Sequence, residues 1–169
     1  MPNRAISFFQ PTGAARASPD TGGSGPQDHR ATLLFARHLN AGVHETRTAL
    51  RDLVAALDNT GLAGETIDDC QLIFAEVLNN IAEHAYIGGD GPIALEVALQ
   101  GDGLLCGIAD QGLCLPTGTL PDTGLPKIAP PDHLPEGGFG WHIIRCLACD
   151  LAYRRDGAWN RLTFRVPRL

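Results

Sequence analysis

The sequence predicts an α+β sandwich in which helices cover one face of a mixed, mainly antiparallel sheet. Apolar residues recur at helical spacing in three segments, and short alternating segments flank glycine-containing turns. The segments follow in the order strand, helix, helix, hairpin, long loop, helix and hairpin, which gathers the helices on one side of a sheet. With 169 residues, 44% of them hydrophobic, the chain can bury one core without a disulfide or a metal.

Residues 1–27 are predicted to be a disordered N-terminal tail. Nearly half of them are Gly, Pro, Ser or Thr, and their apolar residues show no period. The predicted domain therefore covers residues 28–169. A short partner-binding segment at residues 6–9, Ile-Ser-Phe-Phe, is the alternative for part of the tail.

The first half of the domain is predicted to hold one strand and two helices. Residues 30–37 have a partly strand-like composition, and residues 43–57 carry apolar side chains at helical spacing until Asn-Thr-Gly at 59–61 stops the helix. The second helix is expected from about Glu65 to Tyr86, with acidic residues in its first turn. A Gly-Gly-Asp-Gly turn then ends it.

A hairpin and a long loop follow the two helices. Residues 92–100 alternate between apolar and other side chains, Gly-Asp-Gly at 101–103 forms a turn, and residues 104–109 return as the second strand. Residues 113–136 are rich in proline and glycine and show little period. Loops of this length inside a domain are usually functional, so this one is predicted to be a lid.

The C-terminal part is predicted as a helix over residues 138–149 and a hairpin with strands at 151–154 and 161–166. Cys146 and Cys149 form a C-x-x-C spacing, for which a metal or redox site is one interpretation. No second cluster accompanies them, so the favoured prediction is two small buried side chains on the helix.

Composition excludes several classes of protein. The net charge of −6 and the lack of a Lys/Arg cluster argue against direct binding of nucleic acid. No apolar run approaches the roughly 20 residues that span a bilayer, so a membrane protein is not expected. The five cysteines are odd in number and scattered, and no secretory signal precedes them, which predicts a reducing, cytoplasmic location.

Glu76, Asn80 and His84 follow one another at four-residue spacing on the second predicted helix. Successive members rotate by about 40° on a helix of 3.6 residues per turn, so the three form a polar stripe beside the apolar face. A carboxylate and a carboxamide one turn apart offer a proton acceptor and the hard oxygen ligands that suit Mg²⁺. Taken alone, such a stripe is also typical of a solvated helix flank.

Two further patterns contain glycine. Asp110 and Gly112 follow the hairpin; an Asp at the mouth of a pocket can accept a hydrogen bond from an exocyclic amine, while the glycine lets a ligand approach the backbone. An ordinary turn is the alternative. Residues 136–142, Glu-Gly-Gly-Phe-Gly-Trp-His, close the long loop and open a helix, where glycines expose backbone N–H groups to an anion and provide a hinge.

In this order the three patterns resemble the N, G1 and G2 boxes of the ATPase superfamily shared by gyrase, heat-shock chaperones and sensor histidine kinases. The stretch EVLNNIAEHAY (76–86) has the form E-x-x-x-N-x-x-x-H-x-Y. Together with EGGFGWHII (136–144), it resembles the anti-sigma-factor serine/threonine kinase family of the GHKL superfamily. The resemblance covers about residues 30–169 and implies the Bergerat, or histidine kinase-like ATPase, fold.

The resemblance also implies roles for individual residues. In that family the N-box glutamate is the proposed general base, the asparagine holds Mg²⁺, and the aspartate of D-x-G binds adenine. Glu76 is thereby predicted as the catalytic residue and Asn80 as the metal ligand. Nucleotide binding is predicted for Asn80, His84, Asp110, Gly112, Gly138, Phe139, Gly140 and Asn160.

The last predicted strand departs from the family pattern. Many relatives carry a G-T-x-V-like strand whose threonine lies beside the adenine-binding aspartate. Here the segment reads AWNRLTF (158–164), and directing Leu162 and Phe164 inward puts Asn160 in the position of that threonine. Asparagine can still donate a hydrogen bond, so nucleotide binding is still expected.

The implied function is that of an ATP- and Mg²⁺-dependent serine/threonine protein kinase acting as an anti-sigma regulatory factor. It would phosphorylate a STAS-type anti-anti-sigma partner, bind a sigma factor and form a homodimer. The alternative is a non-catalytic, nucleotide-responsive anti-sigma or adaptor module; Glu76 favours the enzyme, because binding alone needs no base. A detached catalytic domain of a histidine kinase phosphorelay is less favoured, since residues 136–144 resemble the anti-sigma group.

Overall fold

A computed structural model describes residues 8, 31–121 and 139–168 of the chain. The elements are β1 (Thr32–Asn40), α1 (Val43–Asp58), α2 (Gly64–Asn80), the π-helical turn η1 (Ile81–Ala85), β2 (Pro92–Gln100), β3 (Gly103–Asp110), α3 (Gly140–Leu147), β4 (Cys149–Asp156) and β5 (Trp159–Pro167). None of the described helices is long and apolar enough to cross a membrane.

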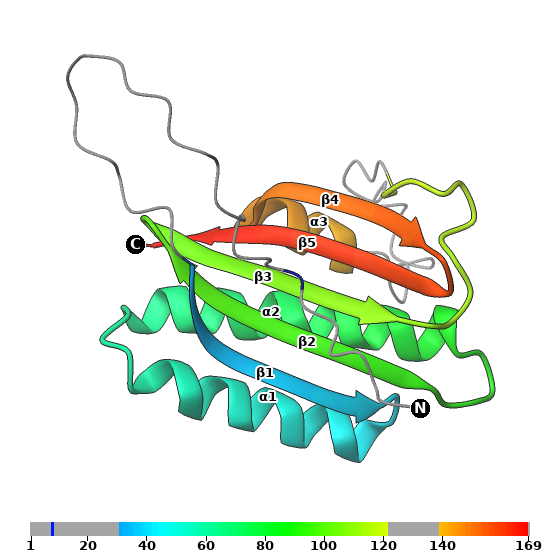
Figure 1. Ribbon diagram of the computed structural model, residues 1–169, viewed down its shortest axis with the longest axis horizontal. Helices are drawn as coiled ribbons and strands as arrows, with labels where there is room; N and C mark the ends of the chain where they lie inside the picture. The colour runs from blue at the N-terminus through cyan, green and yellow to red at the C-terminus, as the bar shows by residue number, and fades with distance from the viewer. Residues whose placement is uncertain (1–7, 9–30, 122–138, 169) are drawn as a thin grey trace, which may run out of the picture.

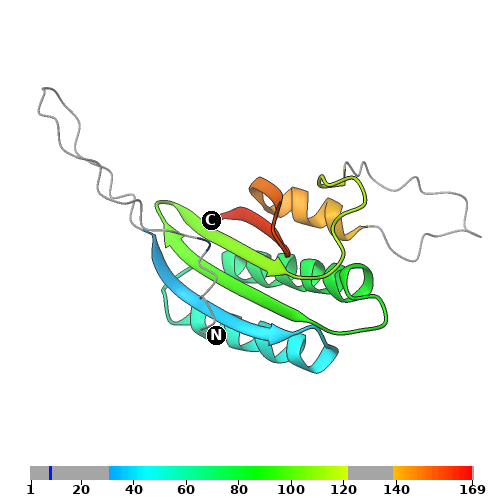
Figure 2. The same cartoon turned by 45° about the vertical axis from the view of Figure 1, so that its right-hand side comes forward.

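The five strands form one sheet in the order β1-β2-β3-β5-β4. All four strand pairs are antiparallel, so the described sheet is antiparallel throughout rather than mixed. Figures 1 and 2 show the helices packed along the sheet, with α1 under β1 and α2 running beside it. The predicted α+β class with helices on one face of the sheet is confirmed, and none of the helices that the structure describes covers the other face.

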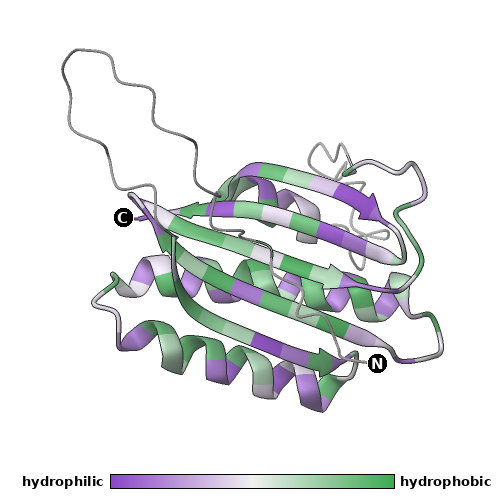
Figure 3. Ribbon diagram, in the orientation of Figure 1, coloured by the Kyte–Doolittle hydropathy of each residue, from purple (hydrophilic) through white to green (hydrophobic). Residues whose placement is uncertain are grey.

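The core lies between the helices and the sheet. Phe74 of α2 and Phe164 of β5 meet edge to face, with ring centroids 5.7 Å apart, and both are fully buried. Figure 3 shows the apolar character of β2 and β3, whose alternate residues complete this layer. An aromatic pair of this geometry contributes about 0.5–1.5 kcal/mol beyond the burial of its area. The pair therefore joins β5 to α2, and both elements contribute residues to the site described below.

The predicted elements exist, but several boundaries differ. The first strand is Thr32–Asn40 rather than residues 30–37, because pairing with β2 continues to the end of β1. The second helix becomes a π-helical turn after Asn80, and the last hairpin is longer at both ends than predicted. Of the predicted loop over residues 113–136, only residues 113–121 are described, and the tail at 1–27 is described only at Phe8.

The prediction for the C-x-x-C pair was wrong. Cys146 lies on α3 and Cys149 is the first residue of β4, and both side chains are exposed. The helix ends at Leu147, and Asp150 adopts a positive φ of 54° as the chain enters the strand. The two thiols therefore belong to different elements and do not share a buried helical face.

Replacing Phe74 by alanine tests the central role of the aromatic pair. We expect Phe74→Ala to lower the free energy of unfolding by about 3–5 kcal/mol, because it opens a cavity in a fully packed core. Leu72→Ala on the same helix is the matched control; this side chain is 41% exposed, and its truncation should cost about 0.5 kcal/mol or less. Urea titration of both variants gives the comparison, and equal losses would contradict this assignment of the core.

Candidate functional site

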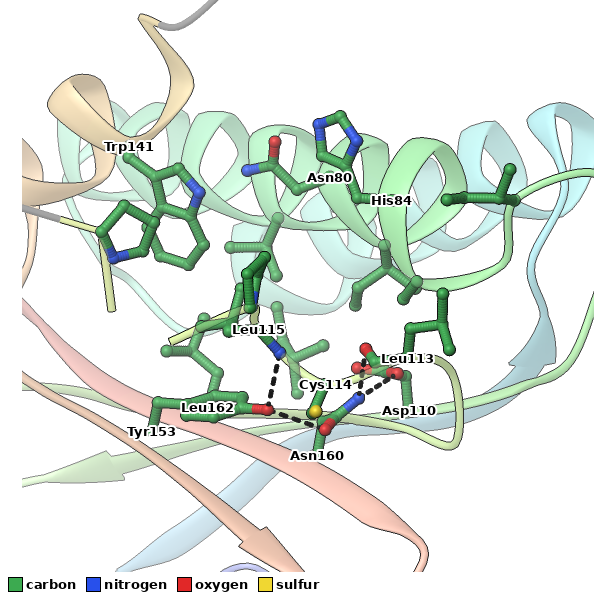
Figure 4. Close-up of a pocket in the computed structure, with 17 residues that line it drawn as sticks. Asn80, His84, Asp110, Leu113, Cys114, Leu115, Trp141, Tyr153, Asn160 and Leu162 are labelled. Atoms are coloured by element: carbon green, nitrogen blue, oxygen red, sulfur yellow. Dashed lines mark hydrogen bonds between the residues drawn. The ribbon is translucent and has the colours of Figure 1, made fainter. Parts of the chain in front are cut away.

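A cavity of about 560 Å³ opens between the C-terminal half of α2 and the sheet. Its walls come from α2, η1, the loop after β3 and the start of α3, and its floor comes from β3, β4 and β5 (Figure 4). The volume is that of a small-molecule site, and such sites are mostly apolar with a few placed polar groups. Here the polar and aromatic side chains that line it are Asn80, His84, Asp110, Trp141, Tyr153 and Asn160.

Asp110 and Asn160 form the polar floor of the cavity. They are direct cross-strand partners, at the end of β3 and near the start of β5. Asn160 Nδ2 and the backbone N–H of Gly112 both donate to Asp110 Oδ1, each at 2.8 Å. Both side chains are almost fully buried, at 6% and 4% exposure. The second carboxylate oxygen, Oδ2, has no hydrogen bond from the described residues and can accept one from a ligand.

The environment of Asp110 shifts its pKa. Burial raises the pKa of this carboxyl above its usual value, because it disfavours the charged form. The amide of Asn160, the N–H of Gly112 and the positive charge of Arg155 act in the opposite direction and limit the rise. Asp110 is therefore a buried acceptor surrounded by donors, as expected for a group that receives a hydrogen bond from a polar ligand atom.

Tyr153 and Arg155 of β4 fix the orientation of Asn160. The Tyr153 hydroxyl and Arg155 Nη1 both donate to Asn160 Oδ1, each at 2.7 Å. Because the carboxamide oxygen receives two donors, its nitrogen must point toward Asp110. Tyr153 also accepts from the backbone N–H of Leu115 at 3.3 Å, so it connects the loop after β3 to the floor of the cavity (Figure 4).

Gly112 brings the loop after β3 against the end of the second helix. A Cβ at Gly112 would lie 2.5 Å from the carbonyl oxygen of Ala85 in η1, and the Leu113 N–H donates to that same oxygen at 2.9 Å. The sequence analysis predicted that Gly112 lets a ligand approach the backbone. In the structure the space beside Gly112 is taken by the helix end, so the glycine is required for packing.

Tyr86 joins the helix end to both strands of the hairpin. Its hydroxyl donates to the carbonyl oxygen of Pro92 at 2.8 Å and accepts from the N–H of Gln111 at 2.7 Å. Burial raises the pKa of Tyr86, and the nearby Asp110 charge adds to the rise, whereas the Gln111 N–H opposes it. The neutral hydroxyl is thus held as a structural bridge directly behind the floor of the cavity.

Glu76 and Asn80 meet the first residue of α3 at the other end of the site. A Cβ at Gly140 would lie 2.6 Å from Glu76 Oε2 and 3.7 Å from Asn80 Nδ2. Asn80 Nδ2 is buried and has no hydrogen-bond partner among the described residues. An orphaned amide atom of this kind costs free energy unless a ligand satisfies it, and the amide nitrogen and oxygen can exchange places by a flip.

The donor set at this end fits Mg²⁺. Asn80 supplies a carboxamide oxygen beside the Glu76 carboxylate, and Mg²⁺ bound with phosphates usually takes only one or two protein oxygens. Across the described residues no group of three or more His, Cys, Asp or Glu side chains could hold a metal. An ion at this position would therefore need oxygen ligands from a phosphate or from water as well.

The remaining predicted site residues lie at the rim or outside the described chain. His84 lines the cavity, but its side chain is 73% exposed and its Nε2 lies 3.9 Å from the Glu83 carboxylate. Asn80 and His84 nevertheless project from the same side of the helix, and the π-helical turn that begins at Ile81 lies between them (Figure 4). Phe139 is 40% exposed just before α3, and Gly138 lies outside the described residues.

Comparisons with known proteins identify the family of the chain. Residues 39–166 match the family described as the histidine kinase-like ATPase domain. The serine-protein kinase RsbW of Bacillus cereus strain AH187 is 32% identical over 106 residues, and that of Bacillus mycoides strain KBAB4 is 29% identical over 110 residues. Each match covers 62% of this chain, and the chain spans about 66% of the length of these curated relatives.

A solved structure supports the fold. The RsbU and RsbW domains of Rv1364c from Mycobacterium tuberculosis match with a TM-score of 0.53 and 18% sequence identity, over 79% of this chain and 32% of that one. The family and fold predicted from the three motifs are thus confirmed. Since the family match extends from β1 to β5, the chain belongs to the histidine kinase-like ATPase family.

Proposed function

We propose that the chain is an ATP- and Mg²⁺-dependent serine/threonine protein kinase that acts as an anti-sigma regulatory factor. It transfers the γ-phosphoryl group of ATP to a serine of a STAS-type anti-anti-sigma partner. It also binds a sigma factor. The observation that carries the proposal is one cavity with Asp110 on its floor and Asn80 in its wall, beside Glu76. Relatives named serine-protein kinase support the same activity.

The base of ATP binds at the Asp110 end. Asp110 Oδ2 accepts a hydrogen bond from the exocyclic amine of adenine, while Oδ1 remains occupied by Asn160 and Gly112. Apolar wall residues such as Ile81 and Leu162 cover the faces of the ring. GTP carries a carbonyl oxygen where ATP has the amine, so it presents an acceptor to the Asp110 carboxylate and binds poorly.

The phosphates extend toward the Glu76 end. Asn80 would hold Mg²⁺ there, and a bound ion would supply positive charge that neutralises the phosphates. Glu76 accepts the proton of the partner's serine hydroxyl as its oxygen bonds to the γ-phosphorus and the bond to the leaving ADP breaks. Gly140 keeps the start of α3 close enough to enclose Glu76 without displacing its carboxylate.

The second candidate is a nucleotide-responsive anti-sigma or adaptor module without kinase turnover. The Asp110 end serves that function equally well, whereas a proton acceptor at Glu76 favours the enzyme, because binding alone needs no base. A homodimeric, cytoplasmic protein is compatible with both. Incubation with labelled ATP, Mg²⁺ and the STAS proteins of the same organism separates the two, because only the kinase transfers label to a serine or threonine.

Asp110→Asn should weaken ATP binding by roughly 10- to 150-fold, which corresponds to losing a buried, charged hydrogen bond of about 1.5–3 kcal/mol. The new amide keeps its oxygen toward Asn160 and Gly112, so its NH₂ group faces the adenine amine, donor against donor. Asp102→Asn on the exposed turn after β2 is the matched control and should bind ATP normally. Calorimetric titration measures both, and an unchanged dissociation constant for Asp110→Asn would remove this residue from the site.

Glu76→Gln should keep ATP binding and lose phosphoryl transfer. Glutamine preserves the shape and hydrogen bonding of Glu76 but cannot take a proton, and general bases typically contribute about 10²–10⁴-fold to the rate. Asn80→Ala should instead weaken Mg²⁺-dependent ATP binding together with transfer. Parallel ATP titration and single-turnover transfer assays distinguish the two effects. Parental transfer by Glu76→Gln would rule out Glu76 as the base.

Gly140→Ala should lower phosphoryl transfer while the protein remains folded. The added methyl group takes a position 2.6 Å from Glu76 Oε2, so the carboxylate must swing aside. Gly89→Ala is the matched control, because a Cβ there meets nothing within 4 Å. The same transfer assay, read beside a thermal melt, checks the pair, and an unimpaired Gly140→Ala enzyme would show that Glu76 need not stay beside α3.

A further inference from the structure

The face of the sheet turned away from the helices carries a small site around Gly107. Alternate residues of β2, β3 and β5 enter the core, so the residues between them point to the opposite face. Glu96 is the cross-strand partner of Gly107, and Arg161 lies on the neighbouring strand β5. The site thus has a carboxylate on one side, a guanidinium on the other and a floor without a side chain.

Phe8 from the N-terminal segment occupies this site. Its backbone N–H donates to Glu96 Oε2 at 2.9 Å, and its ring centroid lies 5.6 Å from the Arg161 guanidinium carbon. A Cβ on Gly107 would lie 2.5 Å from Phe8 Cγ and 2.7 Å from Cδ1. The aromatic side chain therefore rests directly on the backbone of β3.

Gly107 is best explained by this contact. A glycine inside a strand lowers stability relative to alanine and often marks a close approach by another group. Gly107 has no positive φ that would require glycine for conformational reasons. The group that occupies the missing side-chain space is the Phe8 ring.

The Glu96 carboxylate and the Arg161 guanidinium on either side of Gly107 suit an aromatic residue whose backbone N–H donates a hydrogen bond. Arg161 Nε lies 3.2 Å from Asp156 Oδ2 but has no hydrogen-bond partner among the described residues, and the side chain is only 14% exposed, so the cation is poorly hydrated beside the ring. Cation–π attraction is strongest under those conditions. Burial raises the pKa of Glu96, while the Phe8 N–H and the charges of His38 and Arg161 oppose the rise.

We propose that the outer face of the sheet is a docking site for the N-terminal segment of the same chain, anchored by Phe8. Residues 9–30 join Phe8 to β1 and can reach up to about 70 Å when extended. A five-stranded sheet is only about 20 Å wide, so the connection within one chain is easily made. A second copy or a partner protein that uses this face must displace Phe8.

A double-mutant cycle on the full chain tests the proposal. In the parent, Gly107→Ala should lower the melting temperature, because the methyl group expels Phe8 from its site. In the Phe8→Ala background the same change should raise the melting temperature, because alanine is favoured over glycine in an open strand. Gly64→Ala, whose Cβ meets nothing within 4 Å, is the matched control and should shift both backgrounds equally.

A second measurement follows Phe8 directly. The chain has six phenylalanines, so 4-fluorophenylalanine labelling gives six fluorine signals, and Phe8→Leu identifies the one from Phe8. We expect that signal to be protected from a soluble paramagnetic agent in the parent and to become accessible in Gly107→Ala.

Three outcomes would overturn the proposal. An equal effect of Gly107→Ala in both backgrounds would mean that Phe8 does not occupy the site. A Phe8 signal that is accessible to the paramagnetic agent in the parent would mean that Phe8 does not cover the face, which would then be available to a partner protein. Coupling or protection that disappears on dilution would assign the occupant to a second copy instead of the same chain.

Discussion

The orientation of one carboxamide controls the floor of the site. Asn160 Oδ1 receives hydrogen bonds from Tyr153 and Arg155, which forces Nδ2 toward Asp110 and leaves Asp110 with one oxygen satisfied and one open. Each contact depends on antiparallel pairing of β3, β5 and β4, which brings residues from three strands to one end of the sheet. A buried network of this kind favours one geometry, because any member left unsatisfied costs more than a lost surface hydrogen bond.

Close backbone approach sets the two ends of the cavity. Gly112 lets the loop after β3 reach the carbonyl oxygen of Ala85, and Gly140 lets α3 begin beside Glu76. Both contacts involve the second helix or its π-helical continuation, which also sends Phe74 into the core. One helix therefore contacts both ends of the cavity, near Asp110 and beside Glu76, and the core packing that stabilises the fold also holds the site.

Local patterns in the sequence predict most of the fold and only part of the site. Helical and alternating periods, together with the composition of residues 30–37, locate the three α-helices and five strands, and inward Leu162 and Phe164 predict the placement of Asn160 next to Asp110. The apolar spacing does not reveal that the second helix changes to a π-helical turn at Ile81. The sequence analysis did not predict roles for Tyr153 and Arg155, because these roles depend on the register of β4 with β5. The tight turn at Gly157 could have indicated this register. Counting back along both strands from the turn pairs Arg155 with Asn160.

The two faces of the sheet are linked through β5. On β5, Asn160 points into the cavity, and its neighbour Arg161 points to the site on the outer face where Phe8 lies. On β3, Asp110 faces the cavity and Gly107 faces Phe8. Since side chains alternate along a strand, a shift of β5 by one residue would exchange the two sets of contacts and destroy both sites. The pairing of β3 with β5 is thus constrained twice, from the cavity side by the buried Asp110 carboxylate and from the outer side by the poorly hydrated Arg161 cation.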